Sequence, residues 1–215
     1  MKDNNSAFDS TEYDEKIICT LPYYKQFYKQ IIEVVNTYYE EKPLDWLDVG
    51  CGTGKVAEIA FKEAEIKRFV FCDNSVQMID SAKKRFNFLN AEFIISDVQN
   101  INFQDEFDVV TTVQVNHYLK NDERICAIKK CCEALKSGGL FISFENVAPS
   151  GNVSEKLYLE RWKRYQISMG KSYKEAEEHI SRYKKDYYPI SVSEHLETMK
   201  KCGFKEIELL WISYM

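Results

Sequence analysis

An apolar run that ends in an acid and three alternating glycines, within residues 44–54, constrains the fold of this chain more than any other feature. The run predicts a strand that stops at Asp48, and glycines without a Cβ let the backbone turn sharply and pass close to a ligand. A helix is expected directly afterwards, with its unpaired N–H groups directed at that ligand. A dinucleotide-binding turn would have its third glycine three residues after the second, and Lys55 stands there instead. The glycines are Gly50, Gly52 and Gly54.

A second strand and a second acid follow at the distance that a nucleotide-binding unit needs. Residues 68–72 form a short apolar run that stops at Asp73, and this acid lies 19 residues beyond the last glycine (73 − 54). An acid about 20 residues after such a turn accepts hydrogen bonds from ribose hydroxyls, although a solvated turn residue gives the same pattern. Asn74 and Ser75 predict a helix N-cap, and Met78 follows at helical spacing.

Further apolar runs continue an alternation of strands and helices. Residues 91–95 predict a third strand, 106–113 a fourth and 138–144 a fifth, with a helix over about 121–136. Strands that alternate with helices predict a parallel sheet covered on both faces, which is a doubly wound α/β fold. Residues 205–215 predict a sixth strand.

These segments resemble the motifs of the class I S-adenosylmethionine (SAM) methyltransferases, whose fold is a Rossmann-like, mostly parallel sheet flanked by helices. Residues 48–54 resemble motif I, 73–78 resemble motif II, 96–98 resemble the segment that meets the adenine amine, and 107–110 resemble the opening of motif IV. The resemblance covers nearly the whole chain and implies an enzyme that uses SAM. It implies that the cofactor is bound by Tyr24, Asp48, Gly50, Cys51, Gly52, Gly54, Asp73, Asn74, Met78, Asp97, Val98 and Val113.

Within that class, the chain is distantly similar to the tRNA wobble-uridine carboxymethyltransferases. Those enzymes use carboxy-SAM, whose extra carboxylate is held by an arginine, and Arg182 lies near the matching place. Tyr24 corresponds to their cofactor-contacting tyrosine. Motif I departs from the sub-family, which lacks the later glycines. The similarity rests on Phe8, Asp9 and residues 13–14, 21–24 and 170–204.

Length and composition predict one globular domain. A chain of 215 residues can bury a substantial core. No apolar run approaches the roughly 18–20 residues of a membrane span, and the polar start is unlike a signal peptide, so we expect a cytoplasmic protein. The seven cysteines are odd in number, which favours reduced thiols, and we expect no metal site. The net charge of −5 disfavours non-specific binding to a polyanion.

The domain is expected to have four parts. Residues 1–42 predict a helical lid, 43–149 the cofactor-binding core, 150–189 a helical cap, and 190–215 the last helix and strand. The cap follows the fifth strand, at the carboxyl ends of the strands where ligands bind in open α/β folds. We therefore predict that it binds the acceptor. Its two helices are expected over 153–168 and 172–185, with Gly170 as the break.

The usual antiparallel seventh strand of the class has no residues left to form it. Either the chain has been shortened or a partner completes the sheet edge. Because an unprotected apolar strand edge promotes association, a homodimer is expected slightly more than a monomer.

The acceptor is less defined than the cofactor, because SAM brings its own reactive methyl group. Residues 113–119 lack the Asn/Asp-Pro-Pro-Tyr/Phe sequence of amide- and adenine-N6-modifying enzymes and the Pro-Cys nucleophile of cytosine-C5 enzymes. His117 is the candidate general base, since imidazole titrates near neutrality; the alternative is a histidine packed behind the cofactor. His179 and His195 are expected on the surface.

Three functions remain open at this point. The first is methyl transfer to a small molecule, which the acidic balance and the aromatic cap favour. The second is modification of tRNA with SAM or carboxy-SAM, because residues 156–185 contain nine basic side chains. Four glutamates in the same stretch indicate a solvated helical face instead. The third is SAM binding without catalysis.

Overall fold

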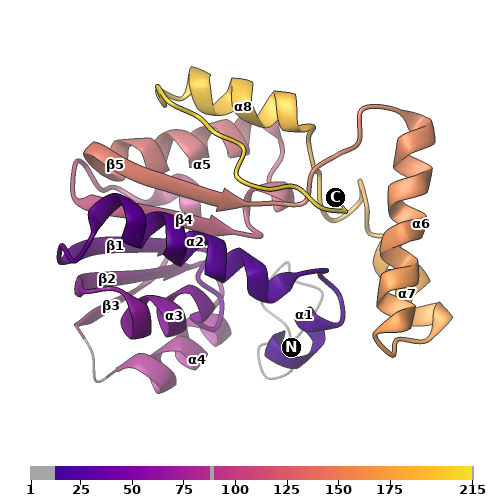
Figure 1. Ribbon diagram of the computed structural model, residues 1–215, viewed down its shortest axis with the longest axis horizontal. Coiled ribbons are helices and arrows are strands. Elements are labelled where there is room, and N and C mark those ends of the chain that lie inside the picture. Colours follow the sequence, from indigo (N-terminus) through magenta and orange to yellow (C-terminus); the bar gives the residue numbers. More distant parts are fainter. Residues whose placement is uncertain (1–12, 88–89, 215) are drawn as a thin grey trace.

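The computed structural model describes residues 13–87 and 90–214 and contains a parallel sheet between two layers of helices, with further helices beyond one end of the sheet (Figure 1). The sheet order is β3-β2-β1-β4-β5, and every strand pair within it is parallel. The order reverses between β1 and β4, which opens a crevice at the carboxyl ends of these two strands. The strands are β1 Leu44–Val49, β2 Ile66–Asp73, β3 Ala91–Ile95, β4 Phe107–Val113 and β5 Leu135–Phe144. The predicted doubly wound fold is confirmed.

The helices follow the predicted alternation with the strands. Ser75 caps the helix after β2, because its side-chain oxygen accepts a hydrogen bond from the backbone N–H of Met78 (3.1 Å). The helices are α1 Tyr13–Ile18, α2 Tyr24–Tyr39, α3 Lys55–Glu63, α4 Val76–Phe86, α5 Asn121–Ala134, α6 Asn152–Ser168, α7 Tyr173–Ile180 and α8 Val192–Lys201, with the short 3-10 turns η1 Val98–Asn100 and η2 Asn116–Tyr118. In the described part of the chain, every helix is too short or too polar to cross a lipid bilayer.

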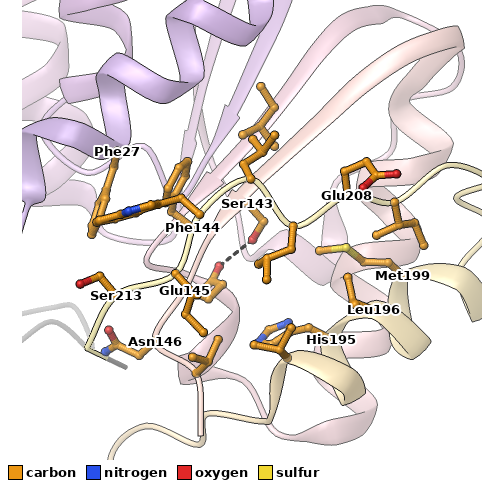
Figure 2. Close-up of a pocket in the computed structure, with 18 of the residues that line it drawn as sticks. Phe27, Ser143, Phe144, Glu145, Asn146, His195, Leu196, Met199, Glu208 and Ser213 are labelled. Atoms are coloured by element: carbon orange, nitrogen blue, oxygen red, sulfur yellow. Dashed lines mark hydrogen bonds between the residues drawn. The ribbon is translucent and has the colours of Figure 1, made fainter. Parts of the chain in front are cut away.

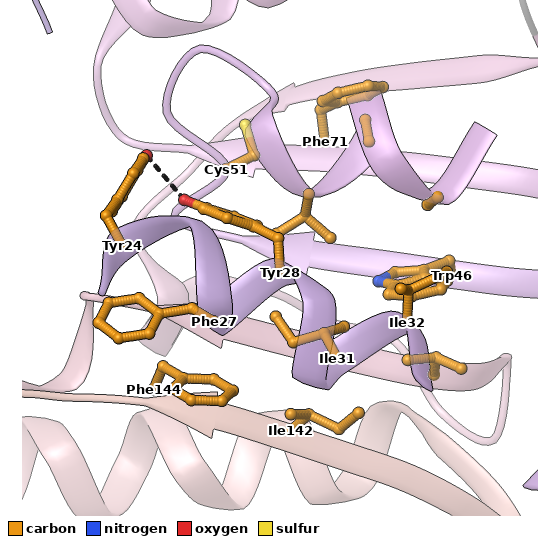
Figure 3. Packing of buried hydrophobic residues seen from close by; sticks show 14 of the residues in the cluster. Tyr24, Phe27, Tyr28, Ile31, Ile32, Trp46, Cys51, Phe71, Ile142 and Phe144 are labelled. Atoms are coloured by element: carbon orange, nitrogen blue, oxygen red, sulfur yellow. Dashed lines mark hydrogen bonds between the residues drawn. The ribbon is translucent and has the colours of Figure 1, made fainter. Parts of the chain in front are cut away.

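The core has two halves, one on each face of the sheet. Neighbouring residues of a strand point to opposite faces, so Trp46 packs on one side with α2 and α3 while Leu47 packs on the other with α5. Figure 3 shows the first half, where Phe27 of α2 stacks on Phe144 of β5 with ring centroids 5.0 Å apart. This packing holds the strand ends rigidly below the crevice.

The cap lies beyond the carboxyl ends of the strands and is fastened to the N-terminal segment (Figure 1). The indole N–H of Trp162 donates to the backbone carbonyl of Thr20 (2.6 Å), and the hydroxyl of Tyr165 donates to the carbonyl of Ile18 (3.0 Å). The predicted break at Gly170 is confirmed, since α6 ends at Ser168 and α7 begins at Tyr173, but α7 stops at Ile180, five residues before its predicted end.

The predicted sixth strand is wrong. Residues 205–214 run alongside β5 but form no strand, and no backbone hydrogen bond joins them to β5 in the described part of the chain. A strand requires a neighbour that pairs its backbone groups, and a cavity of about 410 Å³ separates this segment from the free edge of β5. Side chains fix the segment instead, since Trp211 packs against Phe27 and Tyr23 with ring centroids 5.8 and 5.6 Å away.

Candidate functional site

The glycine turn, residues 50–54, lies at the crevice and has open space above it. Gly52 has a φ of +53°, which favours glycine, and a Cβ built there would meet no atom within 4 Å. Gly50 serves a different purpose, because a Cβ at this position would lie 2.3 Å from the side chain of Val115. The turn therefore leaves room for a ligand over Gly52 and for close packing of the β4 loop at Gly50.

A cavity of about 130 Å³ lies over this turn, and we call it the cofactor cavity after its predicted ligand. It collects residues from the ends of β1, β2 and β4, from α1 and from the turn after β4. Eight of the predicted cofactor residues line it: Gly50, Gly52, Asp73, Asn74, Met78, Asp97, Val98 and Val113. The lining residues that the sequence did not single out as cofactor-binding are Tyr13, Val49, Ser96, Gln99, Gln114, Val115, Tyr118 and Leu119.

Asp73 and Asp97 form the acidic rim of the cavity. One oxygen of Asp73 accepts the N–H of Gly52 and the other accepts the N–H of Ser75, both at 2.9 Å. Asn74 donates from its amide to Asp97 at 2.9 Å. Asp73 therefore fixes the glycine turn to the end of β2 and presents an acceptor at the position where a ribose is expected.

Asp48 lies beneath the turn as a buried carboxyl group that is only half satisfied. The hydroxyl of Thr111 donates to its Oδ1 (2.7 Å), while Oδ2 has no hydrogen-bond partner within the described residues. Burial, with a contribution from the charge of Asp73, raises the pKa of Asp48 to about 7. Asp48 does not line the cavity above the turn, but a cation held over the turn would favour its ionised form, and SAM carries positive charge at its sulfonium and its ammonium.

The other predicted cofactor residues do not line the cavity. Tyr24 is buried, and its hydroxyl accepts from that of Tyr28 (2.7 Å), as Figure 3 shows. Cys51 is buried, and burial raises the pKa of its thiol. Gly54 packs against the ring of Phe86, since a Cβ there would lie 2.6 Å away from it. Their roles as cofactor contacts stay predictions. Phe8 and Asp9 lie outside the described residues.

His117, the candidate base, is buried in the turn that follows β4. Its Nδ1 lies 2.7 Å from a carboxylate oxygen of Glu145, so Nδ1 carries the hydrogen and Nε2 is the atom able to accept a proton. The ring lies against Tyr118, with centroids 4.4 Å apart, and lines neither of the two cavities described here. Tyr118 therefore separates this part of the turn from the cofactor cavity, and the role of base stays a prediction.

The expected surface position of His195 is wrong, and His179, also expected on the surface, is partly buried. His195 is 7% exposed and lines the larger cavity, and burial lowers its pKa. His179 packs edge-on against Trp162, with centroids 5.2 Å apart, and burial lowers its pKa to about 3. Helical spacing alone does not show which face of α7 or α8 meets another element, so it does not predict the burial of these two side chains.

The larger cavity lies along the free edge of β5, between this strand, α8 and residues 206–214. Gln114 lies on the wall of both this cavity and the cofactor cavity. Figure 2 shows Glu145, Asn146 and His195 around one end of the larger cavity, and Leu196 and Met199 of α8 along its side. The described residues contain no group of three or more side chains able to hold a metal ion.

Glu145 is the main site residue that the sequence did not single out. It follows β5 directly, while Asp73 is the last residue of β2 and Asp48 the last but one of β1. An acid at the carboxyl end of a predicted strand is therefore a signal that could have identified all three residues as site candidates.

Comparisons with known proteins agree with this geometry. Residues 47–139 match the family model described as a methyltransferase domain. The carboxy-S-adenosyl-L-methionine synthase of Staphylococcus epidermidis is 23% identical over 93% of this chain and 87% of its own length. That of Nautilia profundicola is 26% identical over 93% and 85%. Among solved structures, a SAM-dependent methyltransferase from Clostridium acetobutylicum has a TM-score of 0.55 and 27% identity over 64% of this chain and 56% of that one. The YcgJ protein of Bacillus subtilis has a TM-score of 0.62 and 17% identity over 83% and 68%.

Proposed function

Because the chain belongs to the class I S-adenosylmethionine-dependent methyltransferases, we propose that it transfers the methyl group of SAM to a small-molecule acceptor. The cofactor class fits the cradle over Gly52 and the half-satisfied carboxyl group of Asp48. The cofactor, when bound, would supply an electrophilic methyl group: the acceptor lone pair bonds to the methyl carbon, the carbon–sulfur bond breaks, and S-adenosylhomocysteine leaves with that electron pair.

The arrangement of charges in the cap supports a small molecule, rather than tRNA, as the acceptor. Lys163 lies between Glu160 (2.8 Å) and Glu177 (3.1 Å), so its charge is neutralised within the cap itself. Further pairs of the same kind are Arg164–Glu160, Lys174–Glu178, Arg182–Asp186 and Lys184–Glu155. A surface for tRNA needs basic side chains that are available to phosphates, and most of the basic side chains of this cap are paired with acids.

The chain's own residues have separate tasks in this proposal. Asp73 accepts hydrogen bonds from the ribose and Asp97 from the adenine side of the cofactor. Asp48 balances the positive charge above the turn. His117 remains the proposed base through its Nε2; because Tyr118 lies between its ring and the cavity, this role requires the Tyr118 ring to move aside when the acceptor binds. A positioned acceptor and a matched base are what such a transfer requires.

Salt-dependent binding of tRNA tests the choice of acceptor. We expect wild-type protein and an Arg161/Lys163/Arg164 triple alanine variant to bind unmodified bulk tRNA equally weakly in filter binding at low salt. Strong binding by the wild type that is lost in the triple variant and decreases with salt would favour a tRNA acceptor over a small molecule.

A second candidate is the synthesis of carboxy-SAM, in which SAM itself receives a carboxyl group from a small donor. Two observations favour it. Relatives that match 93% of the chain carry that activity in their names. Arg182 is near enough for its charge to lower the pKa of Tyr118, a residue of the cofactor cavity, although burial raises this pKa overall. A guanidinium is suited to holding a carboxylate in a bidentate pair.

Labelled SAM separates the two candidates. The protein is incubated with SAM that carries carbon-13 in its methyl group and with the small-molecule fraction of a bacterial extract, and the products are identified by mass spectrometry. Methyl transfer leaves unlabelled S-adenosylhomocysteine and a labelled acceptor. Carboxy-SAM synthesis instead keeps the label in a sulfonium nucleoside that is heavier by one carboxyl group. Tight binding of SAM with neither product would favour a protein that binds SAM without catalysis.

A further inference from the structure

The turn after β4, residues 114–119, is gripped from two sides by buried charged groups. We propose that Glu145 and Arg124 are positioning residues that hold this turn as a wall of the cofactor cavity and connect it to the cap. The proposal rests on SAM binding and does not depend on which acceptor is used.

Glu145 holds the N–H side of the turn. Its carboxylate accepts the backbone N–H groups of Asn116 (3.0 Å), His117 (3.2 Å) and Val115 (3.4 Å), and it also meets His117 Nδ1 at 2.7 Å. The hydroxyl of Ser143 donates to it as well (3.2 Å). The side chain of Glu145 is 4% exposed. Three successive N–H groups around one buried carboxylate fix the path of the backbone there, because each would otherwise lack a partner away from water.

Arg124 holds the carbonyl side of the same turn. Its guanidinium donates to the backbone carbonyls of Asn116 (3.0 Å) and Leu119 (2.7 Å), although the residue is only 2% exposed. It also donates to the carbonyl of Tyr188, which belongs to the cap. In turn, the backbone N–H of Tyr188 donates a hydrogen bond to the carbonyl of His117 (2.5 Å). The cap and the turn are therefore joined through the same guanidinium.

The turn that Glu145 and Arg124 hold contributes four residues to the wall of the cofactor cavity: Gln114, Val115, Tyr118 and Leu119. Gln114 has a φ of +60°, a backbone conformation that a residue with a side chain seldom adopts. Its neighbour Val115 is held by Glu145 and packs on Gly50 of the glycine turn. A shift of the turn would thus move one wall of the cavity against the glycine turn that forms the other wall.

Glu145→Gln tests the first grip, because glutamine keeps the shape but replaces one accepting oxygen by a donor that faces other donors. Asp108→Asn is the matched control. Asp108 is also a buried carboxylate that accepts a backbone N–H, from Asp45 (3.0 Å), and pairs with Lys136 (2.8 Å), but it lies at the start of β4, away from the cofactor cavity. We expect Glu145→Gln to raise the Kd for SAM about tenfold, whereas Asp108→Asn should lower thermal stability and leave that Kd unchanged.

Isothermal titration calorimetry with SAM measures the Kd, and amide hydrogen exchange should show faster exchange at residues 115–117 in Glu145→Gln alone. A folded Glu145→Gln protein with the wild-type Kd would overturn the proposal, and so would an equal loss of affinity in Asp108→Asn. If Glu145→Gln does not fold, Arg124→Lys serves instead, since lysine keeps the charge but cannot reach three carbonyls at once. A wild-type Kd in that variant would also overturn the proposal. Binding of SAM by the wild type shows that the site itself is intact.

Discussion

Replacing Asp48 with asparagine tests whether the glycine turn lies on a carboxyl group that resists ionisation. In the folded chain its pKa rises from 3.8 to about 7, chiefly because burial removes the carboxylate from water. The folded protein therefore binds a proton at this position more tightly than the unfolded chain does. By linkage, such a group makes the protein less stable as the pH rises between the two pKa values.

The magnitude follows from the two pKa values. Below the unfolded-state pKa the group is protonated in both states and contributes no pH dependence. Between the values only the folded state retains the proton, so stability decreases by about 1.4 kcal/mol per pH unit. Above about pH 7 both states are ionised and the loss is constant. From roughly pH 5 to pH 8, the wild type should lose about 2.5 kcal/mol relative to Asp48→Asn.

Urea unfolding followed by tryptophan fluorescence, at several pH values and without SAM, measures this difference. The asparagine variant has its own constant cost, because its amide nitrogen lies where Oδ2 has no described partner. That cost does not depend on pH. The test is therefore how the difference in unfolding free energy between wild type and Asp48→Asn changes with pH. If the difference between the two proteins stays constant from pH 5 to pH 8, the assignment of a raised pKa to Asp48 is refuted.

Three further substitutions test the cofactor contacts and the attachment of the cap. Asp73→Ala is expected to weaken SAM binding by about 1–3 kcal/mol, since it leaves hydrogen-bond partners unpaired in a buried site; unchanged affinity in calorimetry would contradict the ribose assignment. Gly52→Val should abolish SAM binding by filling the open space over the turn, whereas Gly170→Val, also at positive φ with open space but in the cap, should leave the Kd unchanged and lower only the Tm. Trp162→Phe removes the hydrogen bond to the carbonyl of Thr20 (2.6 Å), so calorimetric scanning should show a Tm lower by about 2–4 °C; a Tm equal to that of the wild type would show that this bond does not fasten the cap.

The sheet and its cofactor edge were predictable because their signals are local. The apolar residues from Leu44 to Val49 are enough to predict a strand. Ser75 caps α4 through a hydrogen bond to a residue only three positions away. The segment 205–214 was not predictable in the same way. Its apolar residues suit a strand, but whether a strand forms depends on a neighbouring backbone, and the sequence does not show where that neighbour is.

The burial of single polar side chains is not predictable from local patterns. His195, expected on the surface, is 7% exposed, and Arg124, for which the sequence contains no signal, is 2% exposed. Arg124 is buried because three backbone carbonyls, two from the turn after β4 and one from the cap, converge on its guanidinium. Such convergence arises from segments that are more than sixty residues apart, for which local periodicity contains no information.

The acids at three strand ends show that a sequence can predict where a site lies without predicting the role of each residue in it. Asp48, Asp73 and Glu145 all lie within two residues of the carboxyl end of a strand, but the donors around each carboxylate differ. Asp48 has a single described donor and holds its proton to a higher pH. Asp73 accepts the N–H groups of Gly52 and Ser75 and also lines the cavity, so its carboxylate lies where a ligand bound there would meet it. Glu145 has five donors, and although burial opposes ionisation, these bonds, above all the one from His117, hold its pKa below the usual range. One sequence signal thus leads to a charge-balancing group, a ligand acceptor and a structural anchor, because the surrounding donors decide which of the three each carboxylate becomes.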